Sequence, residues 1–143
     1  MPGKAITLLM AACLLALAAC SRTPSEEALR ARIAGMAAAV EARDADGLLA
    51  PVARDFGGPD GLDRDGLRRL VRLSFLRNAG IGTTLGPMSI RVEGDRAQVE
   101  FDAGLTGGRG LLPERAQLYA VETGWRFEDG EWMLISAQWT PRL

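Results

Sequence analysis

The stretch "MSIRVEGDRAQVEF", residues 88–101, alternates apolar and polar residues on both sides of a short turn. A period of two is typical of a half-buried strand, and Gly94 with Asp95 favours a two-residue hairpin turn. This register pairs Met88 with Phe101, Ile90 with Val99, Val92 with Ala97, Arg91 with Gln98 and Glu93 with Arg96. A shift by one residue would move the charges into the core, so the stretch predicts an antiparallel hairpin with one apolar face.

A second hairpin is predicted in "AQLYAVETGWRFEDGEWMLISAQW", residues 116–139, with its turn at Asp129 and Gly130. This turn places Phe127 opposite Trp132, Trp125 opposite Leu134 and Thr123 opposite Ser136, with Tyr119, Val121 and Gln138 extending the same face. The reverse face then carries Leu118, Ala120, Met133, Ile135, Ala137 and Trp139. Both faces are therefore largely apolar, and helices can cover only one. We expect the other face to contact a second copy of the chain or an envelope protein.

Three helices are predicted ahead of the sheet, because apolar residues there repeat every three or four positions. The first starts at "TPSE" with Thr23 as its cap and ends near Arg43. Its inward stripe is predicted to be Leu29, Ile33, Met36 and Val40. The second is short, with Asp46 as its cap, and it ends or kinks at Pro51.

The third predicted helix runs from Asp63 to about Asn78. Its inward face is predicted to consist of Leu67, Leu70, Val71, Ser74 and Phe75. Arg64, Arg68 and Arg72 follow one another at four-residue spacing, either as a solvated face or against anionic head groups. The glycine-rich segments 54–61 and 104–115 are predicted to be loops, and the sheet is expected to begin after 80–87.

The order of three helices followed by a long meandering sheet resembles the NTF2-like, or cystatin-like, superfamily. The resemblance is carried by "EARDADGLLA" (41–50), "VEGDRAQVEF" (92–101) and "FEDGEWMLISAQW" (127–139). It implies an α+β fold over residues 24–143, a single domain in which N-terminal helices pack on a curved, mainly antiparallel sheet. Members of this superfamily include ligand carriers, dimerisation modules, isomerases and dehydratases, so the fold alone does not define a function.

The resemblance implies a pocket between the helices and the sheet, which the second hairpin would line. The candidate residues are Tyr119, Thr123, Trp125, Trp132, Ser136 and Gln138. The tryptophans would form an apolar wall and the others would supply polar groups to a small apolar ligand. The alternative is that these residues belong to an ordinary packed core.

The composition excludes several kinds of catalysis. The chain has no histidine, its single lysine is Lys4, and its two cysteines are Cys13 and Cys20. Imidazole bases, Schiff-base lysines and the usual zinc sites are therefore not expected, nor is any cofactor. A small isomerase or lyase using a desolvated carboxylate, such as Asp102 or Glu122, remains the alternative to a non-catalytic binding module. The formal net charge of −1 predicts no affinity for nucleic acid.

The N-terminal stretch "LLALAACS", residues 14–21, ends an apolar run at a cysteine. The run over 5–19 is shorter than the ~20 residues that a membrane-spanning helix needs, and it reads as an export signal. "LAAC" (17–20) resembles the lipobox of bacterial lipoproteins, which implies cleavage after residue 19 and acylation of Cys20. Ser21 resembles the outer-membrane sorting signal of that family. We expect a periplasm-facing lipoprotein held to its membrane by residues 20–23, a tether of at most ~10 Å.

Overall fold

The computed structural model describes residues 23–108 and 115–142. Its helices are α2 (Glu26–Glu41), α3 (Ala45–Leu49) and α4 (Arg64–Arg77), with one 3₁₀ turn at Pro59–Gly61. The strands are β1 (Val52–Gly57), β2 (Gly80–Leu85), β3 (Ser89–Glu93), β4 (Arg96–Gly108), β5 (Arg115–Glu128) and β6 (Glu131–Arg142). Among the described residues, no helix has both the length and the apolar character needed to cross a bilayer.

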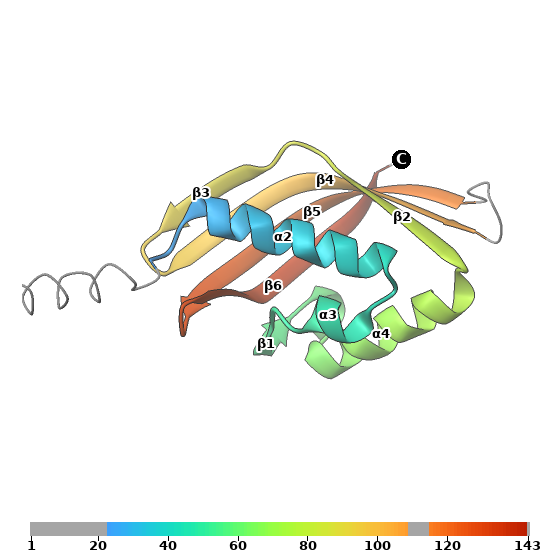
Figure 1. The fold of residues 1–143 in the computed structure, drawn as a ribbon, viewed down its shortest axis with the longest axis horizontal. Helices are drawn as coiled ribbons and strands as arrows, with labels where there is room; N and C mark the ends of the chain where they lie inside the picture. The colour runs from blue at the N-terminus through green and yellow to red at the C-terminus, as the bar shows by residue number, and fades with distance from the viewer. Residues whose placement is uncertain (1–22, 109–114, 143) are drawn as a thin grey trace, which may run out of the picture.

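The helices lie on one side of a curved sheet (Figure 1), with α2 over its strands, α3 beside α2, and α4 beside α3 and near β1. The strand order is β1-β6-β5-β4-β2, and β3 pairs with the first part of β4 while β2 pairs with its second part. All pairings are antiparallel except β1 with β6. The predicted α+β class, with N-terminal helices on a mainly antiparallel sheet, is confirmed.

The first hairpin has the predicted register. Ile90 pairs with Val99, Arg91 with Gln98, Val92 with Ala97 and Glu93 with Arg96. Gly94 has a positive φ of 60°, a conformation that costs glycine little and explains its place in the turn. Val99 is fully buried, so the apolar face of this hairpin faces the core as expected.

The second hairpin departs from the predicted register at a β-bulge. Phe127 pairs with Trp132 and Trp125 with Leu134, as predicted, but Gly124 then pairs with Ser136 and Thr123 with Ala137. The predicted pairing of Thr123 with Ser136 is therefore wrong. Ile135 is an extra residue in β6, and such a residue moves every later side chain to the opposite face. Gly124 fits this arrangement, because a Cβ atom there would collide with the Ser136 hydroxyl.

The bulge changes both faces of the hairpin. Ala137 is buried and Trp139 packs against the core, whereas Ser136 and Gln138 are exposed on the sheet face away from the helices. The prediction that Ala137 and Trp139 lie on an apolar reverse face is wrong. What remains there of the predicted apolar set is Leu118, Ala120, Met133 and Ile135, interrupted by charged and polar side chains.

Two predicted loops are partly strands. Residues 54–57 belong to β1, in which Val52, Ala53 and Phe56 are buried, and 104–108 continue β4. The expected start of the sheet after 80–87 is also wrong, since β2 begins at Gly80. β1 and β2 are edge strands formed by pairing with residues far along the chain, which local composition does not reveal. The predicted loop residues 109–114 lie outside the described part of the chain.

The helix ends and one inward residue also differ from the prediction. Ser25, not Thr23, accepts the capping hydrogen bond of α2 from Ala28, and Asp44, not Asp46, caps α3. Asp63 caps α4 as predicted for its start. Leu70 is 47% exposed and therefore does not belong to the inward face of α4, whose buried residues are Val71 and Phe75.

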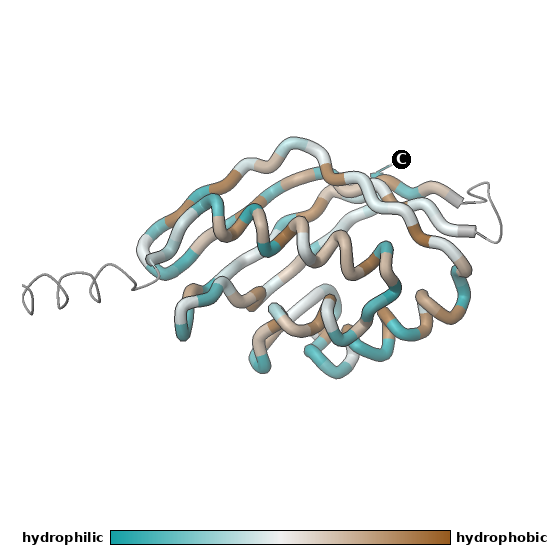
Figure 2. The backbone as a smooth tube through the Cα atoms, in the orientation of Figure 1, coloured by the Kyte–Doolittle hydropathy of each residue, from teal (hydrophilic) through white to brown (hydrophobic). Residues whose placement is uncertain are grey.

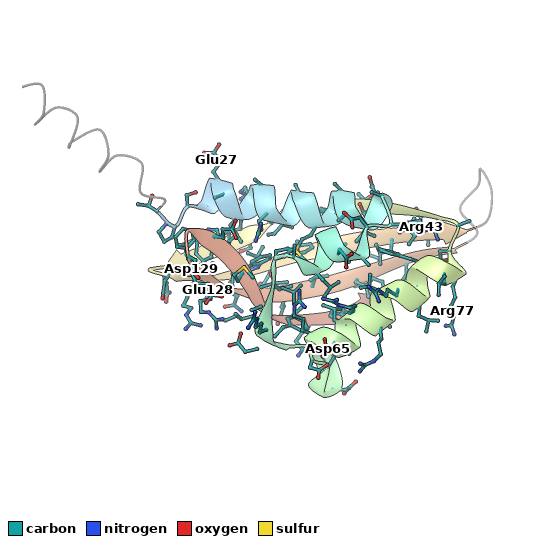
Figure 3. The ribbon with its side chains drawn as sticks, turned by 60° about the horizontal axis from the view of Figure 1, so that its bottom comes forward. Glu27, Arg43, Asp65, Arg77, Glu128 and Asp129 are labelled. Carbon is teal, nitrogen blue, oxygen red and sulfur yellow. The ribbon has the colours of Figure 1, made fainter. Side chains whose placement is uncertain are left out.

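The core lies between α2 and the sheet and continues under α3 and α4. It contains Leu29 and Ile33 from α2, Leu49, Val71 and Phe75 from the other helices, and Val99, Trp125, Trp132 and Leu134 from the sheet. Figure 2 shows the corresponding alternation of hydrophobic and hydrophilic residues along α2. Arg43, labelled in Figure 3, joins the ends of two helices by donating hydrogen bonds to the carbonyls of Phe75 and Ala79.

Candidate ligand pocket

An apolar pocket of about 190 Å³ lies between α2 and the inner face of the sheet. Its helical wall comes from Ile33, Met36, Ala37, Val40 and Leu48. Its sheet wall comes from Leu85, Phe101, Ala103, Leu105, Val121, Trp125 and Leu134. The alternation of strand side chains brings odd-numbered residues of β4 and β5 to this wall. Among the described residues, the polar side chains of the wall are those of Thr83 and Thr123.

The Thr123 hydroxyl is part of an internal hydrogen-bond chain. Its Oγ1 accepts a hydrogen bond from Trp125 Nε1 at 2.8 Å and donates one to the Val99 carbonyl at 3.2 Å. Thr123 is 8% exposed and Trp125 is 2% exposed. A hydroxyl has one proton to donate, and here that proton is already used. The Thr123 hydroxyl proton is therefore bound to the Val99 carbonyl and is not available to a ligand.

Thr83 is occupied in the same way at the edge of the pocket. Its hydroxyl donates to Glu41 Oε1 at 2.7 Å, and its backbone N–H donates to the same oxygen at 3.0 Å. These two bonds lower the pKa of Glu41 below its ordinary value, the hydroxyl bond contributing most. They also join the end of α2 to the edge strand β2. Both hydroxyls of the pocket wall thus have their protons committed to protein acceptors.

The six predicted binding residues lie in different places. Thr123 and Trp125 line the pocket together. Trp132 is buried nearer the beginning of α2, where its Nε1 donates to the Ser25 carbonyl at 3.0 Å and its ring meets Phe127 edge to face. Tyr119 shares the inner face of β5 and pairs with Ala103, but it does not line the pocket.

Ser136 and Gln138 lie on the uncovered sheet face because of the bulge. They border a polar hollow of about 380 Å³ together with Arg91, Glu93, Arg96, Gln98 and Glu122. Sequence reasoning did not anticipate this hollow, although the first hairpin already placed Arg91 and Glu93 on its wet face. The alternation in β3 therefore predicted part of the hollow. The part formed by Ser136 and Gln138 of β6 could not be predicted without the bulge.

The two candidate catalytic carboxylates also lie on this outer face. Asp102 Oδ1 accepts a hydrogen bond from Arg142 Nε at 2.7 Å, and Glu122 borders the polar hollow. No Asp or Glu side chain of the described residues is among those that line the apolar pocket. The pocket wall therefore offers no carboxylate that could act as a desolvated base. Within residues 23–108 and 115–142, no cluster of His, Cys, Asp and Glu is arranged to bind a metal ion.

Arg126 organises the charges near the edge of the outer face. Its guanidinium forms a two-point pair with Asp55 at 2.9 and 3.0 Å and a further bond with Glu128 at 2.9 Å. Its hydrogen bonds with Asp55 and then Glu128 raise the pKa of Arg126, and the same Arg126 bond lowers the pKa of Asp55. The group fastens β1 to β5 and is separate from the apolar pocket. Glu128 is labelled near the hairpin turn in Figure 3.

At the level of sequence, neither a known protein family nor a curated protein matches this chain. Solved structures do share its fold. An NTF2-like protein of unknown function from Pseudomonas putida KT2440 is 20% identical, with a TM-score of 0.70 over 80% of this chain and 84% of that one. A protein proposed to be a dehydratase of the NTF2-like family, from Streptomyces avermitilis, is 21% identical, with a TM-score of 0.71 over 82% and 95%.

A third similar structure is a longer protein. Bd1075 of Bdellovibrio bacteriovorus is 13% identical, with a TM-score of 0.72, and the match covers 80% of this chain but 40% of that protein. Identities this low show the fold alone. The chain therefore has the NTF2-like, or cystatin-like, fold, and its activity has to be argued from its own residues.

Proposed function

We propose that this chain is a lipid-anchored protein of the bacterial envelope whose NTF2-like domain binds a small apolar ligand without catalysing a reaction. The observation that carries the binding role is the pocket under α2, whose wall is apolar apart from two threonines with committed hydroxyl protons. A ligand with a charge or several hydrogen-bonding groups would lose its hydration there without replacement. The chemistry of the wall therefore selects an uncharged hydrocarbon-like group.

The volume of the pocket limits the size of the ligand. An apolar protein cavity of about 150 Å³ stays dry and binds a benzene-sized molecule. The pocket here, about 190 Å³, fits a single ring or a short branched chain. Binding would be driven by the removal of apolar surface from water.

The binding role is tested by filling the pocket. Ala37 lines the pocket, and its neighbour Ala38 is exposed on the same helix. Leucine in place of Ala37 would occupy ligand space, whereas leucine in place of Ala38 would point to solvent. The full chain is purified from its bacterial envelope and its retained small molecules are measured by native mass spectrometry. Wild type and Ala38→Leu should retain the same apolar molecule, and Ala37→Leu should lose it. Equal retention by Ala37→Leu would refute the pocket assignment.

The envelope location rests on the N-terminal sequence, and Cys20 lies outside the described residues. A short apolar run that ends in "LAAC" supports cleavage before Cys20 and its acylation, and several acyl chains give stable membrane attachment. Ser21 favours the periplasmic side of the outer membrane. We propose no partner protein for the uncovered sheet face. The bulge turns Ala137 and Trp139 toward the core, so the polar Ser136 and Gln138 lie on that face.

The anchor is tested with two cysteine variants. Cys20→Ser should abolish the incorporation of labelled fatty acid and the recovery of the protein with membranes. Cys13→Ser is the matched control, because that residue would leave with the signal peptide, and its acylation should equal wild type. An unmodified full-length wild-type chain in the cytosol would refute the anchor and the location together.

A further inference from the structure

The outward face of α4 exposes three leucines in one row. Leu70, Leu73 and Leu76 are 47%, 44% and 81% exposed, while Val71 and Phe75 on the opposite side of the helix are buried. Residues three apart on a helix lie next to one another, so these side chains form one apolar strip. Single exposed leucines are common on protein surfaces, but an aligned group of them marks a contact surface.

Arginines flank this strip. Arg69, Arg72 and Arg77 are exposed beside the leucines, and we call these six residues the α4 outer surface: Arg69, Leu70, Arg72, Leu73, Leu76 and Arg77. Asp65 is the single acidic residue of α4 and lies at its beginning. Asp65 and Arg77 project from opposite ends of the helix in Figure 3, and Figure 2 shows hydrophobic and hydrophilic residues mixed along it.

These outward arginines have few protein partners. Arg72 is 3.8 Å from the exposed Asp46 of α3, a distance at the limit of an ion pair. No carboxylate of the described residues lies within 4 Å of Arg69 or Arg77. Arg64, by contrast, turns inward and donates to the carbonyls of Leu49 and Val52 at 3.0 Å. The predicted stripe of Arg64, Arg68 and Arg72 therefore does not form one outward face: Arg64 has structural partners, Arg68 is partly buried and Arg72 is exposed.

The chemistry of the α4 outer surface fits a phospholipid surface that carries negative charge. Leucine side chains can enter the boundary between head groups and acyl chains, and guanidinium groups can pair with phosphates in two-point geometry. A second copy of the chain fits less well, because a symmetric contact of this helix with itself would bring arginines together.

We propose that the α4 outer surface docks onto anionic phospholipid and gives the domain a second contact with the membrane. This inference rests on the proposed function in one respect, since the lipid anchor is what brings the domain to a bilayer. The beginning of α2, which follows the anchor segment, lies at one end of the molecule, and α4 lies toward the other end (Figure 1). Two separated contacts would fix how the domain is oriented on the membrane and would not leave it free to rotate on its tether.

The docking is tested by hydroxyl-radical footprinting of the full chain, which reports how exposed individual leucine side chains are. The chain is bound to vesicles of phosphatidylcholine alone or of phosphatidylcholine mixed with phosphatidylglycerol. Oxidation of Leu76 should fall severalfold on the anionic vesicles only, and added salt should restore it. Leu118, 45% exposed on the sheet face, is the internal control and should be oxidised equally on both.

A charge variant and its control separate electrostatic docking from a general loss of binding. Arg69→Gln, Arg72→Gln and Arg77→Gln together should lower the ratio of docked to undocked protein on the order of a hundredfold, from roughly a fivefold loss per arginine. Arg54→Gln, Arg91→Gln and Arg96→Gln make the same change in net charge at exposed positions off α4 and should leave Leu76 protected.

Three results would overturn the inference. These are equal Leu76 oxidation on both vesicle types, protection that survives the α4 charge variant, and protection without vesicles that rises with protein concentration. The last would identify a second copy as the occupant. The mass of the N-terminal peptide is measured in the same samples. If the chain is acylated and Leu76 stays exposed on anionic vesicles, only this inference is refuted. If Leu76 is protected but the chain is not acylated, only the proposed anchor is refuted.

Discussion

Replacing Thr123 by valine tests whether the polar groups behind the pocket are structural. Valine has nearly the shape of threonine but lacks the hydroxyl, so the substitution opens no cavity. It removes the acceptor of the 2.8 Å bond from Trp125 Nε1 and the donor of the 3.2 Å bond to the Val99 carbonyl. Because Trp125 is 2% exposed and the adjoining pocket wall is apolar, the lost acceptor has no ready replacement.

The expected cost follows from that unpaired donor. A buried polar group left without a partner costs about 1–3 kcal/mol, and the added methyl group returns a fraction of this. We predict that Thr123→Val lowers the free energy of unfolding by about 2 kcal/mol and the melting temperature by ~6–12 °C. Urea denaturation followed by circular dichroism measures the change, and the dependence on urea concentration should keep its slope.

Two further variants make the result decisive. Thr140→Val changes an exposed threonine on β6 and should alter the free energy of unfolding by less than ~0.5 kcal/mol. Adding Trp125→Phe to Thr123→Val removes the orphaned donor, so the double variant should lose less than the two single losses combined. If Thr123→Val is as stable as wild type, Trp125 does not depend on this hydroxyl, and the description of the pocket wall is refuted.

Three other outcomes are expected. Because the bonds from Thr83 lower the pKa of Glu41, its ionised form stabilises the fold above the ordinary glutamate pKa of 4.5, and this contribution is lost as the pH falls through the lowered pKa. The difference in unfolding free energy between wild type and Glu41→Ala should therefore shrink on acidification, and a constant difference would contradict it. Arg126→Gln should raise the pKa of Asp55 toward its ordinary 3.8, as measured by NMR titration; an unchanged pKa would show that the pair is absent in solution. Ala37→Leu should also raise the melting temperature of the ligand-free protein, because added methylenes fill apolar space, whereas a lower value would show that the pocket has no room for them.

The parts of the fold that the sequence predicts correctly are local. The hairpin around Gly94 is set by a two-residue turn and by alternation on both sides of it, so its register follows from neighbouring residues alone. The inward stripe of α2 is correct for the same reason, since Leu29 and Ile33 are buried and Met36 and Val40 pack against the core. The edge strands β1 and β2 were missed because their backbone pairs with β6 and β4, which lie far away along the chain. The glycines and charged residues of β1 and β2 are typical of loops, and only the pairing with distant strands makes these segments extended.

The part of the candidate site that β5 contributes was predicted correctly. Thr123 and Trp125 lie in one strand and on one face, so alternation alone brings both to the pocket. The prediction put Ser136 and Gln138 on the wrong face. The face of a β6 residue depends on how many residues pair regularly between it and the turn. A single extra residue changes that number, and nothing in the local composition near Ile135 distinguishes it from its neighbours. The contact of Glu41 with Thr83 could not be predicted without β2.

The bulge at Ile135 links the two faces of the molecule. Without it, Ser136 and Gln138 would point toward α2 and would offer a ligand a hydroxyl and an amide, while Ala137 and Trp139 would extend an apolar patch on the outside. With it, the pocket loses its free polar groups and the outer face gains them. The apolar character of the pocket wall and the absence of Ala137 and Trp139 from the outer face therefore have one physical cause. The exposed leucines of α4 lie on a separate element and are independent of the bulge, so the α4 outer surface stays apolar and basic whichever register β6 adopts.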